Sequence, residues 1–107
     1  MSNALSFSVE QRVVIVTGGT GVLGRAMAAG LVQQGARVCI VGRSKDKAEQ
    51  AVAECSGKGH GEIMYALADV TDERAVTAVV DAVLAKWGCI HDLVNAAGGN
   101  DPAGMKQ

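Results

Sequence analysis

The chain has 107 residues, which is enough for one small domain. Hydrophobic residues make up 49% and charged residues 20% of it, an ordinary globular composition, and the formal net charge is −1. This balance argues against a nucleic-acid or anionic-membrane partner, and no apolar run approaches the ~18 residues of a membrane span. We expect a single domain over residues 1–107, with a lead-in at 1–8 and a loop or disordered tail at 99–107.

The cysteines indicate a reducing environment. Cys39, Cys55 and Cys89 are odd in number, widely spaced and form no Cys-x-x-Cys pair, so neither a disulfide scaffold nor a zinc site is expected. The segment 1–11 lacks the basic and apolar regions of a signal peptide. We expect a cytoplasmic protein with free thiols and no metal site.

Four short segments have the composition of strands. The first, Val13–Thr17, is a continuous β-branched run, which is typical of a strand buried on both faces of a parallel sheet. Similar segments follow at 37–42, 62–68 and 90–95.

Three helices are expected between the strands. The first follows a glycine-rich loop and ends at Gly35, and its predicted buried face consists of Leu23, Ala26, Met27, Gly30 and Leu31. Gly30 inside it suggests close packing on the sheet. Ser44 caps a second helix that ends at Cys55, and Thr71 caps a third that ends near Trp87.

The alternation βαβαβαβ predicts the α/β fold class, with a doubly wound parallel sheet in the order 3-2-1-4. The first two helices then cover one face of the sheet and the third covers the other. The fourth strand forms an apolar edge of the kind that pairs with another chain. We therefore expect a homo-oligomer assembled through that edge.

The loop between the first strand and the first helix has the glycine spacing of a phosphate-binding turn. Gly18 permits a tight turn, Gly21 lets the backbone approach a phosphate, and Gly24 lets the helix lie close to the strand. The N–H groups of the first helical turn point at the anion. This spacing in a strand–loop–helix context predicts a dinucleotide site, the alternative being a glycine turn without a ligand.

The end of the second strand favours NADP(H) over NAD(H). An acidic residue there would bind the ribose 2′-hydroxyl of NAD, but the chain has Gly42 followed by Arg43 and Ser44. A small residue leaves room for a 2′-phosphate, and a guanidinium donates to it in bidentate fashion. The alternative is that Arg43 faces solvent or stacks on adenine.

Two further polar residues end strands of the predicted sheet. Asp69 follows the third strand, where it would accept from the adenine amino group or else cap the next turn. Asn95 ends the fourth strand beside a run of small residues; it would face the cofactor or brace neighbouring strands.

Together these motifs resemble the short-chain dehydrogenase/reductase family. They are Thr17-Gly18-x-x-Gly21-x-x-Gly24, Asp69-Val70, and Leu93-Val94-Asn95-Ala96-Ala97-Gly98. The resemblance implies a Rossmann-type fold and, in a complete member, hydride transfer between a nicotinamide and an alcohol or carbonyl. It implies cofactor contacts from Gly18, Thr20, Gly21, Val22, Leu23, Gly24, Arg43, Ser44, Asp69, Val70, Asn95, Ala96, Ala97 and Gly98.

Within that resemblance, Gly18, Thr20 and Leu23 lie along the pyrophosphate and ribose, and Arg43 lies at the adenosine 2′ position. Asp69 and Val70 flank adenine. Two departures stand out: Val22 replaces the usual glycine, and Ala96 replaces the second asparagine of Asn-Asn-Ala-Gly. The combination is similar to that of mannonate and fructuronate oxidoreductases, a sugar-acid branch whose members often use NADH.

The family's catalytic Ser-Tyr-Lys set has no counterpart in this chain. The only tyrosine is Tyr65, four residues before Asp69 rather than a lysine, and His60 and His91 lack a nucleophile or metal partner at a suggestive spacing. We expect no catalytic residue here, a length that marks a truncation, and a chain that is inactive alone. The alternatives are a stand-alone dinucleotide-binding or assembly module, and a fold that binds no cofactor.

Overall fold

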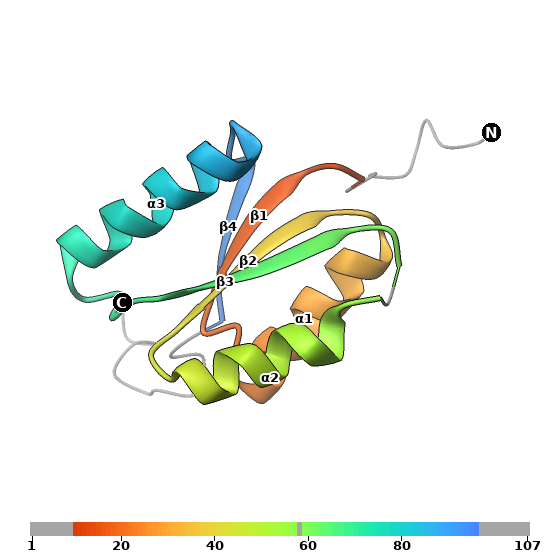
Figure 1. The fold of residues 1–107 in the computed structure, drawn as a ribbon, viewed down its shortest axis with the longest axis horizontal. Coiled ribbons are helices and arrows are strands. Elements are labelled where there is room, and N and C mark those ends of the chain that lie inside the picture. Colours follow the sequence, from red (N-terminus) through yellow and green to blue (C-terminus); the bar gives the residue numbers. More distant parts are fainter. Residues whose placement is uncertain (1–9, 58, 97–107) are drawn as a thin grey trace, which may run out of the picture.

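The computed structural model describes residues 10–57 and 59–96, which form a parallel four-stranded sheet flanked by three helices (Figure 1). The strands lie in the order β3-β2-β1-β4, as the alternation of strands and helices predicts. The elements alternate along the chain as β1 (Val13–Thr17), α1 (Val22–Gln33), β2 (Arg37–Gly42), α2 (Lys45–Cys55), β3 (Glu62–Leu67), α3 (Glu73–Trp87) and β4 (Asp92–Asn95).

The centre of the sheet is its most buried part. β1 pairs with β2 from Val13↔Arg37 to Thr17↔Val41, and with β4 from Val14↔Asp92 to Thr17↔Asn95. Four of the five β1 residues and four of the six β2 residues are buried, which explains their continuous β-branched and apolar sequences. β3 and β4 lie at the two edges.

The helices cover the two faces unequally (Figure 1). α1 and α2 pack side by side on one face, around a core that includes Val16, Val32 and Ile40. Among the described elements, only α3 covers the opposite face, where Val79 and Val83 form a core cluster with Ile15 and Cys39. This is the predicted arrangement, and it leaves the α3 face with less cover.

The predicted buried face of α1 is largely wrong: of its five residues, only Met27 and Leu31 are partly buried, and Leu31 packs against the core. Gly24, Ala28 and Val32 are the residues that α1 buries, whereas Leu23 remains 60% exposed. The predicted reason for Gly30 is also wrong, because a Cβ built there would have open space around it. Gly24, rather than Gly30, is the glycine of α1 that makes a close approach.

Two predicted boundaries shift for local hydrogen-bonding reasons. The N-cap of α3 is Asp72, whose side chain accepts from the Arg74 amide, while Thr71 donates to Asp69 instead. β4 begins at Asp92 rather than at residue 90, and the amide of His91 donates to the Val13 carbonyl ahead of the ladder. Within the described ranges, no helix is long and apolar enough to cross a membrane.

Candidate functional site

A groove of about 590 Å³ lies at the carboxyl ends of the strands. This is the end of an open parallel sheet at which ligands bind, because the loops there separate where the strand order reverses. Three segments and one further residue form its walls: Gly18, Thr20 and Gly21; Val41, Gly42 and Arg43; Ala68, Asp69, Val70 and Thr71; and Ala96.

The glycine loop forms one wall through two close approaches of the backbone. Gly18 has φ +74°, and its amide donates to the Val41 carbonyl at 2.9 Å, which ties the loop to the end of β2. A Cβ at Gly24 would collide with the Gly18 carbonyl and lie 2.6 Å from the Gly19 Cα. The loop therefore folds back onto α1 and brings the glycine backbone at Gly18 and Gly21, together with Thr20, to the groove.

The N-terminus of α1 differs from those of the other two helices. Ser44 caps α2 and Asp72 caps α3 with a side-chain oxygen, and each of these helices has an acidic residue in its first turn. α1 starts after Gly21 with no side-chain cap and no acidic residue in its first turn. The positive end of the α1 dipole therefore lies next to Gly21 in the groove wall with no acidic or capping side chain of its own helix against it, which favours an anion there.

Asp69 is held at the opposite wall by Thr71. Its Oδ1 accepts from the Thr71 amide at 2.9 Å and from the Thr71 hydroxyl at 2.7 Å. These two donors, with a smaller attraction from Arg43, lower the pKa of Asp69. Asp69 therefore caps the following turn and is ionised beside Arg43 at neutral pH.

The end of β4 contributes a brace. The Thr17 hydroxyl donates to Asn95 Oδ1 at 3.0 Å, and the Ala96 amide donates to the Thr17 carbonyl at 2.9 Å. Asn95 also lines a second, mostly apolar groove of about 340 Å³ between α3, β1 and β4. The bracing alternative for Asn95 is thus present as a hydrogen bond, and it aligns the end of β4 with the end of β1.

The structure brings half of the predicted contact residues together. Those that line the groove are Gly18, Thr20, Gly21, Arg43, Asp69, Val70 and Ala96. Val22 and Leu23 lie beside it, exposed in the first turn of α1, and Ser44 Oγ accepts from the Lys47 amide as a helix cap. Ala97 and Gly98 lie outside the described residues.

Sequence reasoning omitted Val41, Ala68 and Thr71 from the groove. Val41 and Ala68 are buried apolar residues that a sequence pattern assigns to the core. Thr71 carried a usable signal, since a hydroxyl two residues after an aspartate is placed to donate to it in a tight turn.

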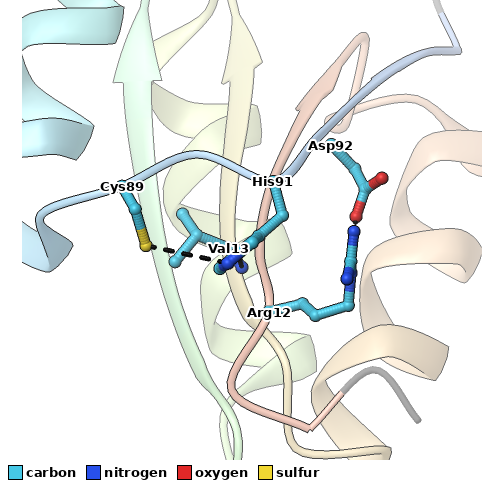
Figure 2. A network of polar contacts seen from close by, with 5 residues as sticks. All are labelled: Arg12, Val13, Cys89, His91 and Asp92. Carbon is cyan, nitrogen blue, oxygen red and sulfur yellow. Dashed lines mark hydrogen bonds and ion pairs between the residues drawn. The ribbon is translucent and has the colours of Figure 1, made fainter.

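The opposite end of the sheet holds a second polar cluster (Figure 2). Arg12 Nε donates to Asp92 Oδ2 at 2.9 Å, which lowers the pKa of Asp92, and the Val13 amide donates to His91 Nδ1 at 2.8 Å. Cys89 Sγ lies 3.9 Å from His91 Nε2, a pairing that the sequence reading missed.

His91 cannot act as a base on that thiol while the Val13 contact holds. A ring nitrogen that accepts a hydrogen bond carries no proton, so the proton of the neutral ring is on Nε2 and faces Cys89. An Nε2–H is neither a general base nor a metal ligand. Among the described residues, no group of three or more His, Cys, Asp or Glu side chains is placed to hold a metal ion.

Tyr65 lies in β3, where its hydroxyl donates to Glu49 Oε2 at 3.3 Å and its ring packs against the core under α1 and α2. Tyr65 is not among the residues that line the groove. The structure thus agrees with a packing role for this residue.

Comparison with known proteins places the fold and the groove in context. The family model described as short chain dehydrogenase matches residues 12–107. The short chain dehydrogenase/reductase dpmpG of Macrophomina phaseolina is 41% identical over 96 residues, which are 90% of this chain and 55% of that protein.

Two solved structures are also similar. A short-chain type dehydrogenase/reductase from Mycobacterium ulcerans has a TM-score of 0.83 and 44% identity, over 87% of this chain and 34% of that one. L-sorbose reductase from Gluconobacter frateurii, complexed with NADPH and L-sorbose, has a TM-score of 0.81 and 29% identity, over 88% and 36%. The chain thus spans about a third of these two structures and about half of the fungal relative's sequence.

Proposed function

The chain belongs to the short chain dehydrogenase family, and we propose that it is the dinucleotide-binding part of an NAD(P)(H)-dependent oxidoreductase. The uncapped N-terminus of α1 at the groove carries this proposal, because it offers backbone donors to a pyrophosphate without a competing side-chain oxygen. A bound nicotinamide supplies hydride transfer to or from an alcohol or carbonyl, with a sugar or sugar acid as our proposed substrate class.

Within the groove, each wall has a distinct role. The backbone of Gly18 to Gly21 holds the pyrophosphate, and Asp69 with Val70 borders adenine. Asp69 Oδ1 is occupied by Thr71, so its second carboxylate oxygen is the one that would accept from the adenine amino group. Asn95, aligned by Thr17, ends the strand nearest the nicotinamide half.

We propose NADP(H) as the preferred cofactor. Gly42 and Arg43 both line the groove, so the end of β2 offers a guanidinium and no carboxylate to the adenosine ribose. The NADPH in the L-sorbose reductase complex is consistent with this preference. An opposing influence is the negative charge of Asp69, which attracts Arg43 and would repel a phosphate bound to that guanidinium.

Calorimetric titration with NADP+ and NAD+ tests both binding and preference. The change Arg43→Ala should weaken NADP+ by about 1.5–3 kcal/mol, the value of a hydrogen bond to a charged group, and leave NAD+ nearly unchanged. Lys45→Ala is the matched control, because Lys45 is a neighbouring exposed cation in the first turn of α2 that does not line the groove. Equal weakening of both cofactors by Arg43→Ala would refute the 2′-phosphate contact.

We further propose that the 107-residue chain binds without catalysing. Its single tyrosine is a β3 residue bonded to Glu49, and no lysine stands four residues after it. The assay is turnover of NADPH with a panel of ketones and sugar acids. Steady turnover at the rate of an ordinary enzyme, on the order of 1 s⁻¹ or more, would show that a catalytic set is present after all.

A homo-oligomer formed through β4 completes the proposal. β4 is an edge strand with Leu93 67% exposed, and the apolar groove beside it continues onto α3. If two β4 strands pair antiparallel, Asp92 lies opposite the partner's Asn95 and no like charges oppose one another. Light scattering should show a dimer that Leu93→Lys dissociates; a wild-type monomer at high concentration would refute the interface.

A further inference from the structure

The side chain of Thr20 occupies the space that any side chain at position 42 would enter. A Cβ built on Gly42 would lie 2.7 Å from Thr20 Cγ2, 2.8 Å from Thr20 Oγ1 and 3.3 Å from Thr20 Cβ. Atoms at the first two distances overlap, so a residue larger than glycine cannot stand at the end of β2 beside this threonine unless one of the two moves.

Rotation of Thr20 does not relieve this overlap. Both of its γ atoms face Gly42, so the third substituent of Cβ, a hydrogen, points away. Turning χ1 by one well moves the hydrogen into one of the two facing positions and leaves a heavy atom in the other. Serine has a single γ atom that can rotate away, whereas valine, like threonine, always presents one.

Backbone hydrogen bonds also oppose a shift of Thr20 or Gly42 that would relieve the overlap. The Gly18 amide donates to the Val41 carbonyl at 2.9 Å, and the Ala68 amide donates to the Gly42 carbonyl at 2.9 Å. The glycine loop, the end of β2 and the end of β3 are thus hydrogen-bonded to one another around the contact. Moving Thr20 away from Gly42 would strain the same loop that lines the groove.

We propose that Thr20 is a specificity-determining residue that excludes an acidic side chain from position 42 and so keeps the site open to a 2′-phosphorylated adenosine. This inference rests on the proposed function. A carboxylate at this strand end selects a free 2′-hydroxyl, because it accepts from the hydroxyl and repels a phosphate. Thr20, a residue of the glycine loop, therefore determines which cofactor the site accepts. Arg43 binds the 2′-phosphate in the space that glycine at position 42 leaves open.

The experiment measures dissociation constants for NADP+ and NAD+ in four chains besides the wild type. They are Gly42→Asp, Thr20→Ala, and the pairs Thr20→Ala/Gly42→Asp and Thr20→Val/Gly42→Asp. Gly42→Asp alone should weaken NADP+ without improving NAD+ by more than about threefold. Adding Thr20→Ala should improve NAD+ binding by about tenfold or more over the wild type, the size of one charged hydrogen bond. Thr20→Val should give no such gain.

A second measurement needs no ligand. Gly42→Ala should lower the thermal midpoint by roughly 5 °C or more beside Thr20, and by clearly less beside Thr20→Ala, which removes both contacts shorter than 3 Å and keeps the 3.3 Å contact with Cβ. Additive effects of the two changes on stability, or a full NAD+ gain with Gly42→Asp alone or with Thr20→Val, would overturn the inference. A wild-type chain that binds neither dinucleotide would instead overturn the proposed function, and the specificity claim would fall with it.

Discussion

The three cysteines differ sharply in their surroundings. Cys39 and Cys55 are buried, and burial raises the pKa of Cys39 to about 12, whereas Cys89 is exposed. At pH 8 a disulfide reagent should therefore label one thiol per folded chain and the other two only in denaturant. Cys89→Ser should abolish the fast reaction, and a fast-reacting thiol in that variant would contradict the burial of the other two.

Asp69 offers a test of the groove wall in solution. Because donors from Thr71 lower its folded-state pKa, Asp69 stabilises the fold above its unfolded pKa of about 3.9, and this contribution is lost as pH falls through the lowered value. Carboxyl titration by NMR should show the pKa of Asp69 rising in Thr71→Val. Asp92, whose lowered pKa depends on Arg12, is the internal control and should not move.

For single residues, the sequence predicted which end of the sheet they occupy better than it predicted which partner each side chain contacts. The motif placed Asp69, Arg43 and Thr20 at one end of the sheet, and the groove contains all three. The Ser44 cap was predicted, and the capping role of Asp69 was one of its two predicted alternatives. The contact of Thr20 with Gly42 was not, because it depends on local angles that no spacing rule encodes. Polar side chains near turns have several partners within reach, and only the folded backbone selects among them.

Among the elements, α1 contains two glycines with opposite roles. Gly24→Ala would place a Cβ against the Gly18 backbone, so it should destabilise the fold by about 1–3 kcal/mol and weaken cofactor binding. Gly30→Ala meets open space and should stabilise the chain by about 1 kcal/mol through helix propensity. Urea denaturation measures both, and equal effects would contradict the close contact between α1 and the loop.

Among the elements, the sequence mispredicted the buried face of α1. The cause is the composition of this helix. Its buried positions, Gly24, Ala28 and Val32, are mostly small, and its exposed first turn contains the larger Val22 and Leu23. Hydrophobic periodicity weights large apolar residues, so it favours the wrong stripe. Because α1 lies close to the glycine loop, the face that it packs against the loop and the sheet requires small residues. This requirement comes from the tertiary structure, so the periodicity of the helix does not reveal it.

Among the described elements, α3 alone covers its face of the sheet. The stability lost when one of its side chains is truncated to alanine should therefore increase with the burial of that side chain. Val83 is fully buried against the sheet, while its neighbour Leu84 is 41% exposed. Val83→Ala should lower the free energy of unfolding by about 2 kcal/mol, and Leu84→Ala should lower it by less than about 1 kcal/mol. A larger loss at Leu84 than at Val83 would show that α3 sits in another rotation.

For the whole molecule, the strand order followed from the alternation of strands and helices, since few topologies satisfy it. The same topology determines where the groove lies. From β1 the chain proceeds to β2 and β3 on one side of the sheet and then to β4 on the other, and ligands bind at the carboxyl ends of the strands where the order reverses. The alternation also divides the polar groups between the two ends of the sheet, but it did not indicate that His91 would lie against Val13 and Cys89. The groove takes Arg43 and Asp69, while Cys89, His91 and Asp92 gather at the far end (Figure 2).

The central claim is that the groove at the carboxyl end of the sheet binds a dinucleotide. Backbone-amide NMR spectra of the chain titrated with NADPH test it most directly. The account predicts saturable shifts of Gly18 to Leu23, Arg43 and Asp69 to Thr71, with the amides of Cys89 to Asp92 unchanged. Shifts centred on Cys89 to Asp92, or no shifts at millimolar NADPH, would contradict it.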